Sequence, residues 1–157
     1  MANSYLLPIY KKIYGSDFDY TRFDNRLEMQ KTIYLLQDMG VPVGSYGFRW
    51  YQYGPYSQSL QDDMFYESRR ECQSLTISKE YAESIDQLRR LINENVHAEY
   101  TRSHWVECLA SLHYLRDNVL SFGVTDDEVV LELEQRKPHL NNREINLSAC
   151  KLVEELF

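Results

Sequence analysis

Apolar residues recur at helical spacing along most of this 157-residue chain, a pattern that predicts a mainly helical protein. Apolar faces of this kind fall within residues 6–13, 27–36, 81–96, 105–119, 129–133 and 145–156. Several helix starts are marked by residues whose short polar side chains can cap free amide groups: Asp24 or Asn25, Ser57, Ser78, Thr101 and Thr125. Asn25 with Glu28, and Thr125 with Glu128, also have the spacing of a reciprocal capping box.

The segment 27–36 differs from the others because apolar residues occupy two sides of the predicted helix. A helix that is apolar on two sides is expected to be central, with most of its surface covered. Gln30 and Lys31 lie between the two stripes, so one of them is expected to need an internal polar partner. The stripes contain Met29, Ile33 and Leu36 on one side, and Leu27, Tyr34 and Leu35 on the other.

Residues 46–51 alternate in the way that is typical of a half-buried strand, with a large aromatic residue at every second position. Successive side chains of a strand point to opposite faces. Phe48 and Trp50 are therefore expected to face the core, and Arg49 and Tyr51 to face outward.

The end of this strand is expected at Gly54 and Pro55, since proline can donate no ladder hydrogen bond. Residues 75–77 are predicted to return as a second strand and to form a small hairpin with the first. The order helix, strand, helix, strand, followed by a helical second half, predicts a single domain over residues 1–157. Its expected architecture is a winged-helix-like core with a helical extension.

The charge balance is acidic, with a net charge of −7 and a pI near 5.1. Nucleic-acid binding draws affinity from Lys and Arg side chains that neutralise phosphates, so this balance argues against non-specific binding to nucleic acid. The clustered basic candidates are Arg69, Arg70, Arg89 and Arg90.

Three widely separated cysteines, Cys72, Cys108 and Cys150, include no C-x-x-C pair. Reduced thiols of this kind are typical of a cytosolic protein. The first residues lack the basic and apolar segments of a signal peptide, and no stretch reaches the roughly 18 apolar residues that a membrane helix needs. We therefore expect a cytoplasmic protein without a membrane partner.

Signatures of hydrolases, kinases and dinucleotide-binding enzymes are missing from the sequence. Asp62 and Asp63 are a candidate carboxylate pair, but neighbours on a helix point to different faces, so a solvated or capping role is preferred. An enzyme on an unfamiliar scaffold, using Lys31, Tyr56 and Asp63, is kept as a third functional hypothesis.

Metal and thiol chemistry have few candidates. His104 and Cys108 stand four residues apart and could share a helix face toward a metal, but two ligands are too few. His97, His113 and His139 do not complete a recognisable spacing, so no metal or cofactor is expected. Cys72 has basic neighbours, yet no base is placed beside it, and an ordinary free thiol is the preferred interpretation.

Six of the twelve residues from 46 to 57 are aromatic: Tyr46, Phe48, Trp50, Tyr51, Tyr53 and Tyr56. This aromatic corner has two interpretations that hold equally well, a packed core or a protein-binding patch, because Tyr, Trp and Arg dominate interface hot spots. A platform for stacking nucleic-acid bases is a third interpretation, but such platforms normally come with a basic groove. The candidate partner-binding residues are Arg49, Tyr51, Tyr53 and Tyr56.

Two segments together resemble a known family. Residues 26–36 have the form L-x-x-Q-K-x-x-Y-L, and residues 48–60 have the form F-x-W-x-x-Y-G-P-Y-S-x-x-L. In this order and spacing they resemble the YwgA-like and SocA/Panacea group of bacterial and phage-associated proteins. The motif positions, which in the family look fold-defining, are Gln30, Lys31, Tyr34, Phe48, Trp50, Gly54, Pro55, Tyr56 and Ser57.

The resemblance implies a small helical domain and, for the Panacea branch, an antitoxin role in which diverse partner toxins are neutralised or delivered to a protease. The leading hypothesis is therefore a non-enzymatic protein-interaction module, antitoxin-like, that acts by direct binding. An acidic surface favours a basic partner, such as a toxin that attacks nucleic acid, through faster steered association. The alternative is a winged-helix transcriptional regulator that binds DNA, which would need a basic recognition helix.

Overall fold

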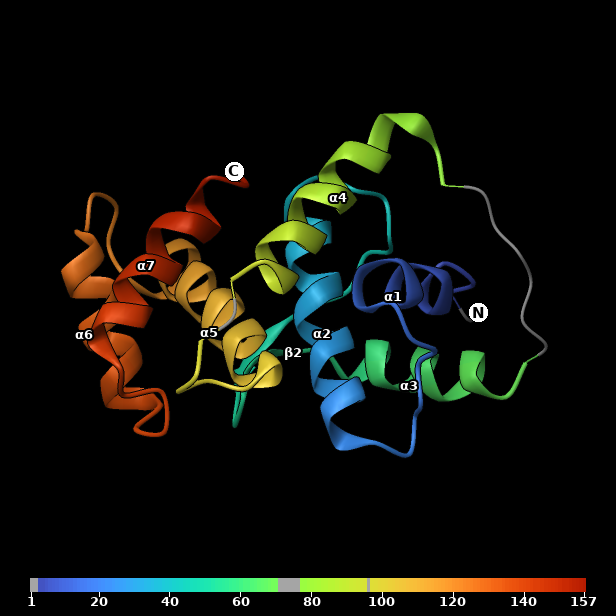
Figure 1. The fold of residues 1–157 in the computed structure, drawn as a ribbon, viewed down its shortest axis with the longest axis horizontal. Coiled ribbons are helices and arrows are strands. Elements are labelled where there is room, and N and C mark those ends of the chain that lie inside the picture. The colour runs from blue at the N-terminus through green and yellow to red at the C-terminus, as the bar shows by residue number, and fades with distance from the viewer. Residues whose placement is uncertain (1–2, 71–76, 96) are drawn as a thin grey trace.

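A computed structural model describes residues 3–70, 77–95 and 97–157 of the chain. Within these ranges the protein contains seven α-helices, one π-helix and a two-stranded antiparallel hairpin (Figure 1). The elements in chain order are α1 (Leu6–Tyr14), α2 (Phe23–Asp38), β1 (Arg49–Tyr51), β2 (Gly54–Tyr56), α3 (Gln58–Ser68), α4 (Lys79–Asn93), α5 (Arg102–Tyr114), the π-helix η1 (Leu115–Val119), α6 (Asp126–Arg136) and α7 (Arg143–Glu154). The prediction of a mainly helical protein with a small hairpin is confirmed.

Two central helices, α2 and α5, pack against each other and join the two halves of the molecule (Figure 1). Around α2 lie α1, α3 and α4, whereas α6 and α7 pack on the other side of α5. Strand β2 contacts both α2 and α5, so the hairpin lies where the two central helices meet. None of the helices in the described ranges is both long and apolar enough to cross a membrane.

Helix α2 is continuously buried from Leu27 to Leu36, as its two apolar stripes predict. Its start differs from the prediction. Arg22 occupies the N-cap position and makes no side-chain cap, so neither Asp24 nor Asn25 caps the helix. The Asn25–Glu28 capping box does not form, because Asn25 accepts a hydrogen bond from the preceding loop and Glu28 accepts one from Arg102.

The other predicted caps are confirmed. Each hydroxyl accepts a hydrogen bond from an amide in the first turn of its helix, and this interaction needs only neighbouring residues. The capping residues are Ser57 on α3, Ser78 on α4, Thr101 on α5 and Thr125 on α6, the last of which forms a complete capping box with Glu128. Val96, at the end of the face predicted for α4, lies outside the described residues.

The hairpin forms with a different second strand from the one expected. After a turn at Gln52 and Tyr53 the chain reverses, and β2 pairs with β1 so that Trp50 faces Pro55. Gly54 and Pro55 therefore do not end the sheet; proline is tolerated because each strand of a two-stranded hairpin keeps a free edge. Ile77 is not part of a strand, and residues 75–76 lie outside the described ranges.

The apolar face predicted over residues 105–119 ends before Val119, because the last turn is the π-helix η1. Leu115 is fully buried, whereas Val119 is exposed. In η1 the amide of Leu120 bonds to the carbonyl of Leu115, five residues back, so the turn is wider than an α-helical turn and its later residues rotate away from the core. Single π-turns of this kind are frequent at functional sites.

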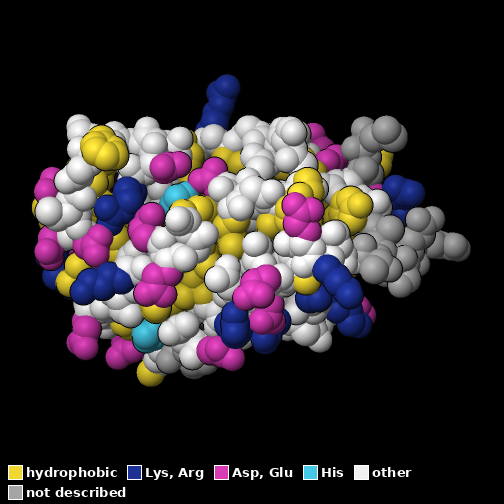
Figure 2. Space-filling view, turned by 90° about the horizontal axis from the view of Figure 1, so that it is seen from above, with side chains coloured by type: hydrophobic (Ala, Val, Ile, Leu, Met, Phe, Trp, Pro, Cys, Tyr) yellow, Lys and Arg dark blue, Asp and Glu magenta, His cyan; other side chains and the backbone are white. Residues whose placement is uncertain are grey.

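Charged side chains of both signs are interspersed on the surface. On the face drawn in Figure 2, the Lys and Arg side chains among the described residues are separated by Asp and Glu side chains and form no continuous basic patch. The basic residues that are clustered in the sequence also have local partners. Arg69 lies over the ring of Phe65, Arg70 pairs with Glu67, and Arg89 and Arg90 pair with Asp86.

Candidate functional site

A pocket of about 230 Å³ opens beside the β1–β2 hairpin, and we call it the hairpin pocket. Three of the four predicted partner-binding residues, Tyr51, Tyr53 and Tyr56, lie together in its wall. The fourth, Arg49, is exposed on β1 but does not line the pocket. The lining consists of Phe23, Arg26, Leu27, Gln30, Lys31, Tyr51, Gln52, Tyr53, Tyr56 and Gln61.

Gln30 fixes the end of the hairpin to α2 by two hydrogen bonds to one residue. Its Oε1 accepts from the backbone N–H of Ser57 (2.9 Å), and its Nε2 donates to the carbonyl of Ser57 (2.8 Å). Both residues are buried, so the amide of Gln30 replaces the ladder partners that the chain lacks at this point. The predicted internal polar partner is confirmed.

Lys31 fixes the middle of β2. Its Nζ donates to the carbonyl of Pro55 (2.7 Å), and its side chain is among the largest fully buried ones of the described residues. Burial lowers the pKa of Lys31 to about 7, although the carboxylate of Glu107 acts in the opposite direction. The amine therefore exchanges its proton near neutral pH.

Lys137 holds the other strand, and its importance was not predicted from the sequence. The Nζ of Lys137 donates to the carbonyl of Tyr51 (3.0 Å) and lies over the rings of Trp50 and Tyr53 (5.0 and 5.8 Å to the ring centres). Burial lowers the pKa of Lys137, and Glu107 again opposes the shift. Glu107 is fully buried and pairs with His139 at 2.9 Å.

The side chains of β1 alternate as predicted. Phe48 and Trp50 are half-buried and pack against the core, where the buried ring of Tyr34 meets Phe48 at 5.1 Å between centres. Arg49 and Tyr51 point outward. The parity prediction for this strand is therefore confirmed.

The tyrosines of the pocket are partly exposed and stacked on neighbours. Tyr51 is 58% exposed and Tyr53 is 40% exposed. The ring of Tyr51 packs on Tyr56 (5.3 Å between centres), and that of Tyr53 packs on Phe23 (5.1 Å). The aromatic corner thus supplies both a core side and an exposed side, while the partner-binding role of the exposed side stays a prediction.

The catalytic group of the third hypothesis is not assembled. Lys31 and Tyr56 line the hairpin pocket, but Asp63 lies elsewhere and accepts a hydrogen bond from the hydroxyl of Tyr46 (2.6 Å). Its neighbour Asp62 accepts from Gln58, on the exposed side of α3. The two carboxylates therefore point to different surroundings, as expected.

The thiol candidates have structural surroundings where the structure describes them. Cys108 is fully buried, and its Sγ donates a hydrogen bond to the side chain of Asn146 (3.3 Å). The thiol is therefore occupied by Asn146 and does not form a pair of metal ligands with His104. Burial raises the pKa of Cys108, which disfavours the thiolate form that reacts and binds metals. Cys72 lies outside the described residues.

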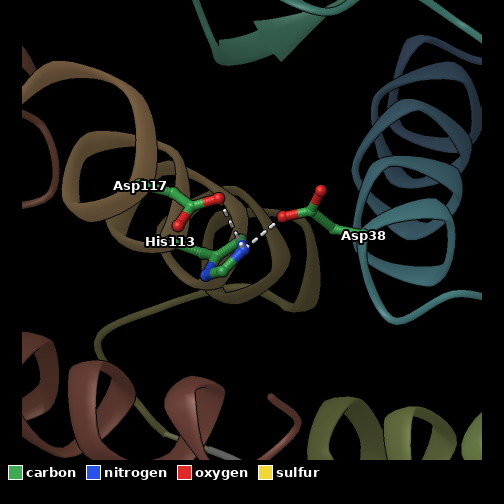
Figure 3. Close-up of side chains that lie close together, drawn as sticks. All are labelled: Asp38, His113 and Asp117. Atoms are coloured by element: carbon green, nitrogen blue, oxygen red, sulfur yellow. Dashed lines mark hydrogen bonds and ion pairs between the residues drawn. The ribbon is translucent and has the colours of Figure 1, made fainter.

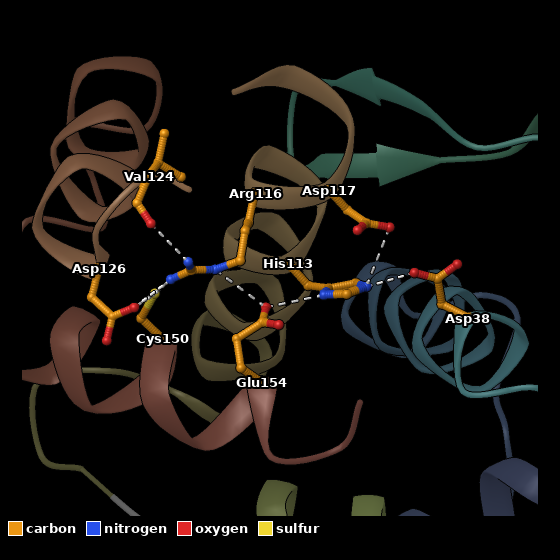
Figure 4. A network of polar contacts seen from close by, with 8 residues as sticks. All are labelled: Asp38, His113, Arg116, Asp117, Val124, Asp126, Cys150 and Glu154. Atoms are coloured by element: carbon orange, nitrogen blue, oxygen red, sulfur yellow. Dashed lines mark hydrogen bonds and ion pairs between the residues drawn. The ribbon is translucent and has the colours of Figure 1, made fainter. Parts of the chain in front are cut away.

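A second polar cluster surrounds His113, and the sequence did not predict it (Figures 3 and 4). The Nε2 of His113 lies 2.5 Å from a carboxylate oxygen of Asp38 and 4.0 Å from one of Asp117. Its Nδ1 lies 3.1 Å from a carboxylate oxygen of Glu154. The i, i+4 spacing of His113 and Asp117 was the one signal of this cluster in the sequence.

Most of the residues that line the hairpin pocket come from two segments of the chain, residues 26–36 and 48–57. Gln30 and Lys31 of the first segment bind the backbone of Pro55 and Ser57 in the second. These motif residues hold the pocket together, and the rings around them give it an exposed rim. No protein-family model, curated protein or solved structure matches this chain.

Proposed function

We propose that this protein is a non-enzymatic interaction module, antitoxin-like, that neutralises or delivers a partner protein by binding it at the hairpin pocket. The observation that carries the proposal is the exposure of Tyr51 and Tyr53 at the rim of a pocket whose floor is fixed by Gln30 and Lys31. Tyrosine is among the residues that dominate interface hot spots, because its large ring buries much area and its hydroxyl keeps a hydrogen bond.

The backbone that presents these rings is held in place before any partner arrives. Lys31 binds β2, Gln30 binds Ser57 directly after β2, and Lys137 binds β1, so both strands are anchored to buried side chains of other elements. A binding surface that is already ordered loses less conformational freedom on association and therefore binds more tightly. Rigid presentation supports a binding role for the hairpin.

The charges suggest the chemistry of the partner. The net charge of −7 speeds encounter with a basic protein, such as a toxin that attacks nucleic acid. Inside the pocket, Arg26, Lys31 and the amide of Gln61 offer hydrogen-bond donors. A basic partner that inserts a carboxylate or a backbone carbonyl here matches both features.

The family resemblance supports the same proposal. The antitoxin-like role is what the resemblance to the SocA/Panacea group implies, and three of the motif positions, Gln30, Lys31 and Tyr56, line the pocket. We place the protein in the cytoplasm, in keeping with its free thiols at Cys108 and Cys150.

The test is partner capture from the native host with the immobilised chain, followed by affinity measurement with the purified partner. Tyr51→Ala, Tyr53→Ala and Arg49→Ala are each expected to weaken binding by about 2 kcal/mol or more, roughly 30-fold in Kd. Their stability should stay within about 1 kcal/mol of wild type, because the side chains are exposed. Denaturant unfolding checks this.

Tyr66→Ala is the matched control, since Tyr66 is exposed on α3 and belongs neither to the β1–β2 hairpin, which carries the three tested residues, nor to the lining of its pocket. Its affinity should equal that of the wild type. Equal affinity of all variants would reject the hairpin and its pocket as the binding surface and leave only the core role of Phe48 and Trp50.

The alternative, a winged-helix regulator that uses the hairpin as its wing, has less support. The helix that precedes the hairpin, α2, is buried from Leu27 to Leu36 and offers no free face to a DNA groove. The arginines of the sequence clusters are also paired with local partners. Sequence-dependent, sub-micromolar DNA binding near physiological salt would favour this alternative over the interaction module.

A further inference from the structure

Three helices end close to His113, and each carries a carboxylate in its last turn. Asp38 is the last residue of α2, Glu154 is the last residue of α7, and Asp117 lies in η1, which ends the α5 helix. The C-terminal end of a helix carries a partial negative charge from its free carbonyl groups. Three acidic side chains and three negative helix ends therefore meet at one place, where a cation is favoured.

His113 lies at the centre of this group and is held in a defined orientation. Its imidazole is buried, stacks on the ring of Phe157 (3.8 Å between centres) and receives Glu154 on its Nδ1 side. Nε2 points toward Asp38 and Asp117, as Figure 3 shows. A histidine that binds a metal usually has its second nitrogen held by a carboxylate or carbonyl in this way.

The basic side chains described near this group do not pair with Asp38 or Asp117. Helix α2, which is described throughout, has no basic residue in its last turn. Arg116 donates to Asp126 and to the carbonyl of Val124, and its Nε lies 3.6 Å from a carboxylate oxygen of Glu154 (Figure 4). Asp38 and Asp117 therefore share only the imidazole of His113 as a partner among these groups.

We propose that Asp38, His113 and Asp117 form a binding site for a divalent transition-metal cation, for which Zn²⁺ is the best match. One imidazole nitrogen and two carboxylate oxygens are ordinary Zn²⁺ ligands. The three ligand atoms all lie within 4.8 Å of one another. The site does not depend on the proposed protein-interaction function.

The distances suit a cation after a small adjustment. Ligand atoms around a tetrahedral Zn²⁺ lie about 3.3 Å apart, because each metal–ligand bond is about 2.0–2.2 Å. The observed distances from Nε2, 2.5 Å to Asp38 and 4.0 Å to Asp117, lie on either side of this value. The side chains of Asp38 and Asp117 are 39% and 59% exposed, so both can rotate, and a cation can enter from solvent.

Protonation of His113 is the competing way to balance the charge. Burial disfavours the imidazolium, but hydrogen bonds with Glu154 and Asp38 outweigh burial and raise the pKa of His113. The two alternatives differ in one respect that can be measured. The proposed cation needs the carboxylate of Asp117 as a ligand, whereas protonation of His113 is favoured by Glu154 and Asp38.

The experiment is calorimetric titration of the full-length chain with Zn²⁺ after treatment with a chelator, at neutral pH. We expect one equivalent of Zn²⁺ per chain and a raised melting temperature, since a ligand that binds only the folded state stabilises it. Asp117→Asn and Asp38→Asn should each weaken binding at least about tenfold, the size of effect seen even when an orienting partner is lost. His113→Gln should weaken it further.

Two controls separate this site from others. Asp127→Asn removes an exposed carboxylate in the first turn of α6 and should bind like the wild type. Co²⁺ in place of Zn²⁺ should give no thiolate-to-cobalt charge-transfer band, because the site has only nitrogen and oxygen ligands. Absence of saturable binding, a thiolate band, or wild-type affinity in the folded Asp117→Asn and Asp38→Asn variants would overturn the proposal.

Discussion

The hairpin pocket and the His113 cluster both use side chains of the central helix α2, but their charges and surroundings are opposite. In the pocket, Lys31 is 2% exposed, and its Nζ donates a hydrogen bond to a backbone carbonyl. In the cluster, the carboxylates of Asp38 and Asp117 reach solvent and face a buried imidazole. Helix α2 therefore contributes a basic side chain, Lys31, to one region and an acidic side chain, Asp38, to the other.

The difference shows how burial decides the effect of a polar contact. In the hairpin pocket, removing one partner leaves a backbone group buried without a hydrogen bond, which is expensive. In the His113 cluster, a carboxylate that loses its partner remains in contact with water, so the loss is small. Substitutions of the buried polar residues in the first region should lower the stability of the fold, and those in the second should change mainly cation binding.

The largest effect is expected at Gly54, where the hairpin approaches α5. Gly54 has φ +92°, and a Cβ added there would lie 2.3 Å from the Oγ of Ser111. Gly54→Ala should lower the free energy of unfolding by about 2–5 kcal/mol, through backbone strain and overpacking. Gly47→Ala is the control, since its Cβ would meet nothing within 4 Å, and it should change stability by less than about 1 kcal/mol. Denaturant unfolding of both variants tests whether the pocket backbone is as rigid as the comparison requires.

Gln30→Ala should lower the free energy of unfolding by about 1–3 kcal/mol, because it leaves the N–H of Ser57 buried and unpaired and leaves its carbonyl with only the amide of Gln61 as a donor. Gln58→Ala, at an exposed position of α3, should change it by about 0.5 kcal/mol or less. Similar stabilities of the two variants would contradict the idea that burial sets the size of these effects.

Lys31→Met keeps the volume of the side chain but removes the donor to Pro55, and it should destabilise the fold by about 1–3 kcal/mol at pH 7. The effect should grow with pH. Because the pKa of Lys31 is lowered to about 7 in the folded state, the unfolded chain binds more protons between pH 7 and about 10. Wild-type stability therefore gains up to about 1.4 kcal/mol per pH unit from Lys31 in this window, and the variant lacks this gain. Denaturant unfolding of both proteins at pH 7 and pH 9 measures this gain. If the free energies of unfolding of the two proteins change with pH in parallel, the pKa of Lys31 is not lowered.

The smallest effect is expected for Asp38→Asn in the presence of a chelator, a change of less than about 1 kcal/mol in either direction. The variant loses a half-exposed contact with His113 but also removes a negative charge from the C-terminal end of α2. Thermal unfolding with and without Zn²⁺ sharpens the comparison, since only the wild type should gain from the cation. A loss comparable to that of Gln30→Ala would show that the two regions do not differ as proposed.

Features that depend on neighbouring residues could be predicted from the sequence. The cap at Ser57 and the box at Thr125 need only residues three positions away, and the alternation of Phe48 to Tyr51 needs only the pleat of a strand. The two apolar stripes of α2 likewise indicated a central helix and a buried partner for Gln30 or Lys31.

Features that depend on distant residues could not be predicted from the sequence. The pairing of β1 with β2 was missed because Gln52 and Tyr53 are not residues that mark a tight turn, and Gly54-Pro55 favours the end of a strand. The π-turn that exposes Val119 leaves the local apolar pattern unchanged. Lys137, Glu107 and Asp38 gain their roles from elements far along the chain, and no spacing rule connects them.

The hydrogen bond between Lys137 and Tyr51 has a consequence for folding during synthesis. The two residues are 86 positions apart, and a hairpin with two short strands is at best marginally stable alone. At a synthesis rate of about 5–20 residues per second, Lys137 follows Tyr51 out of the ribosome after about 4–17 s. During that interval the nascent chain carries Tyr51 without its hydrogen bond to Lys137, so the partner binding that we propose for the hairpin gains a fully anchored β1 only after Lys137 has been translated and folded.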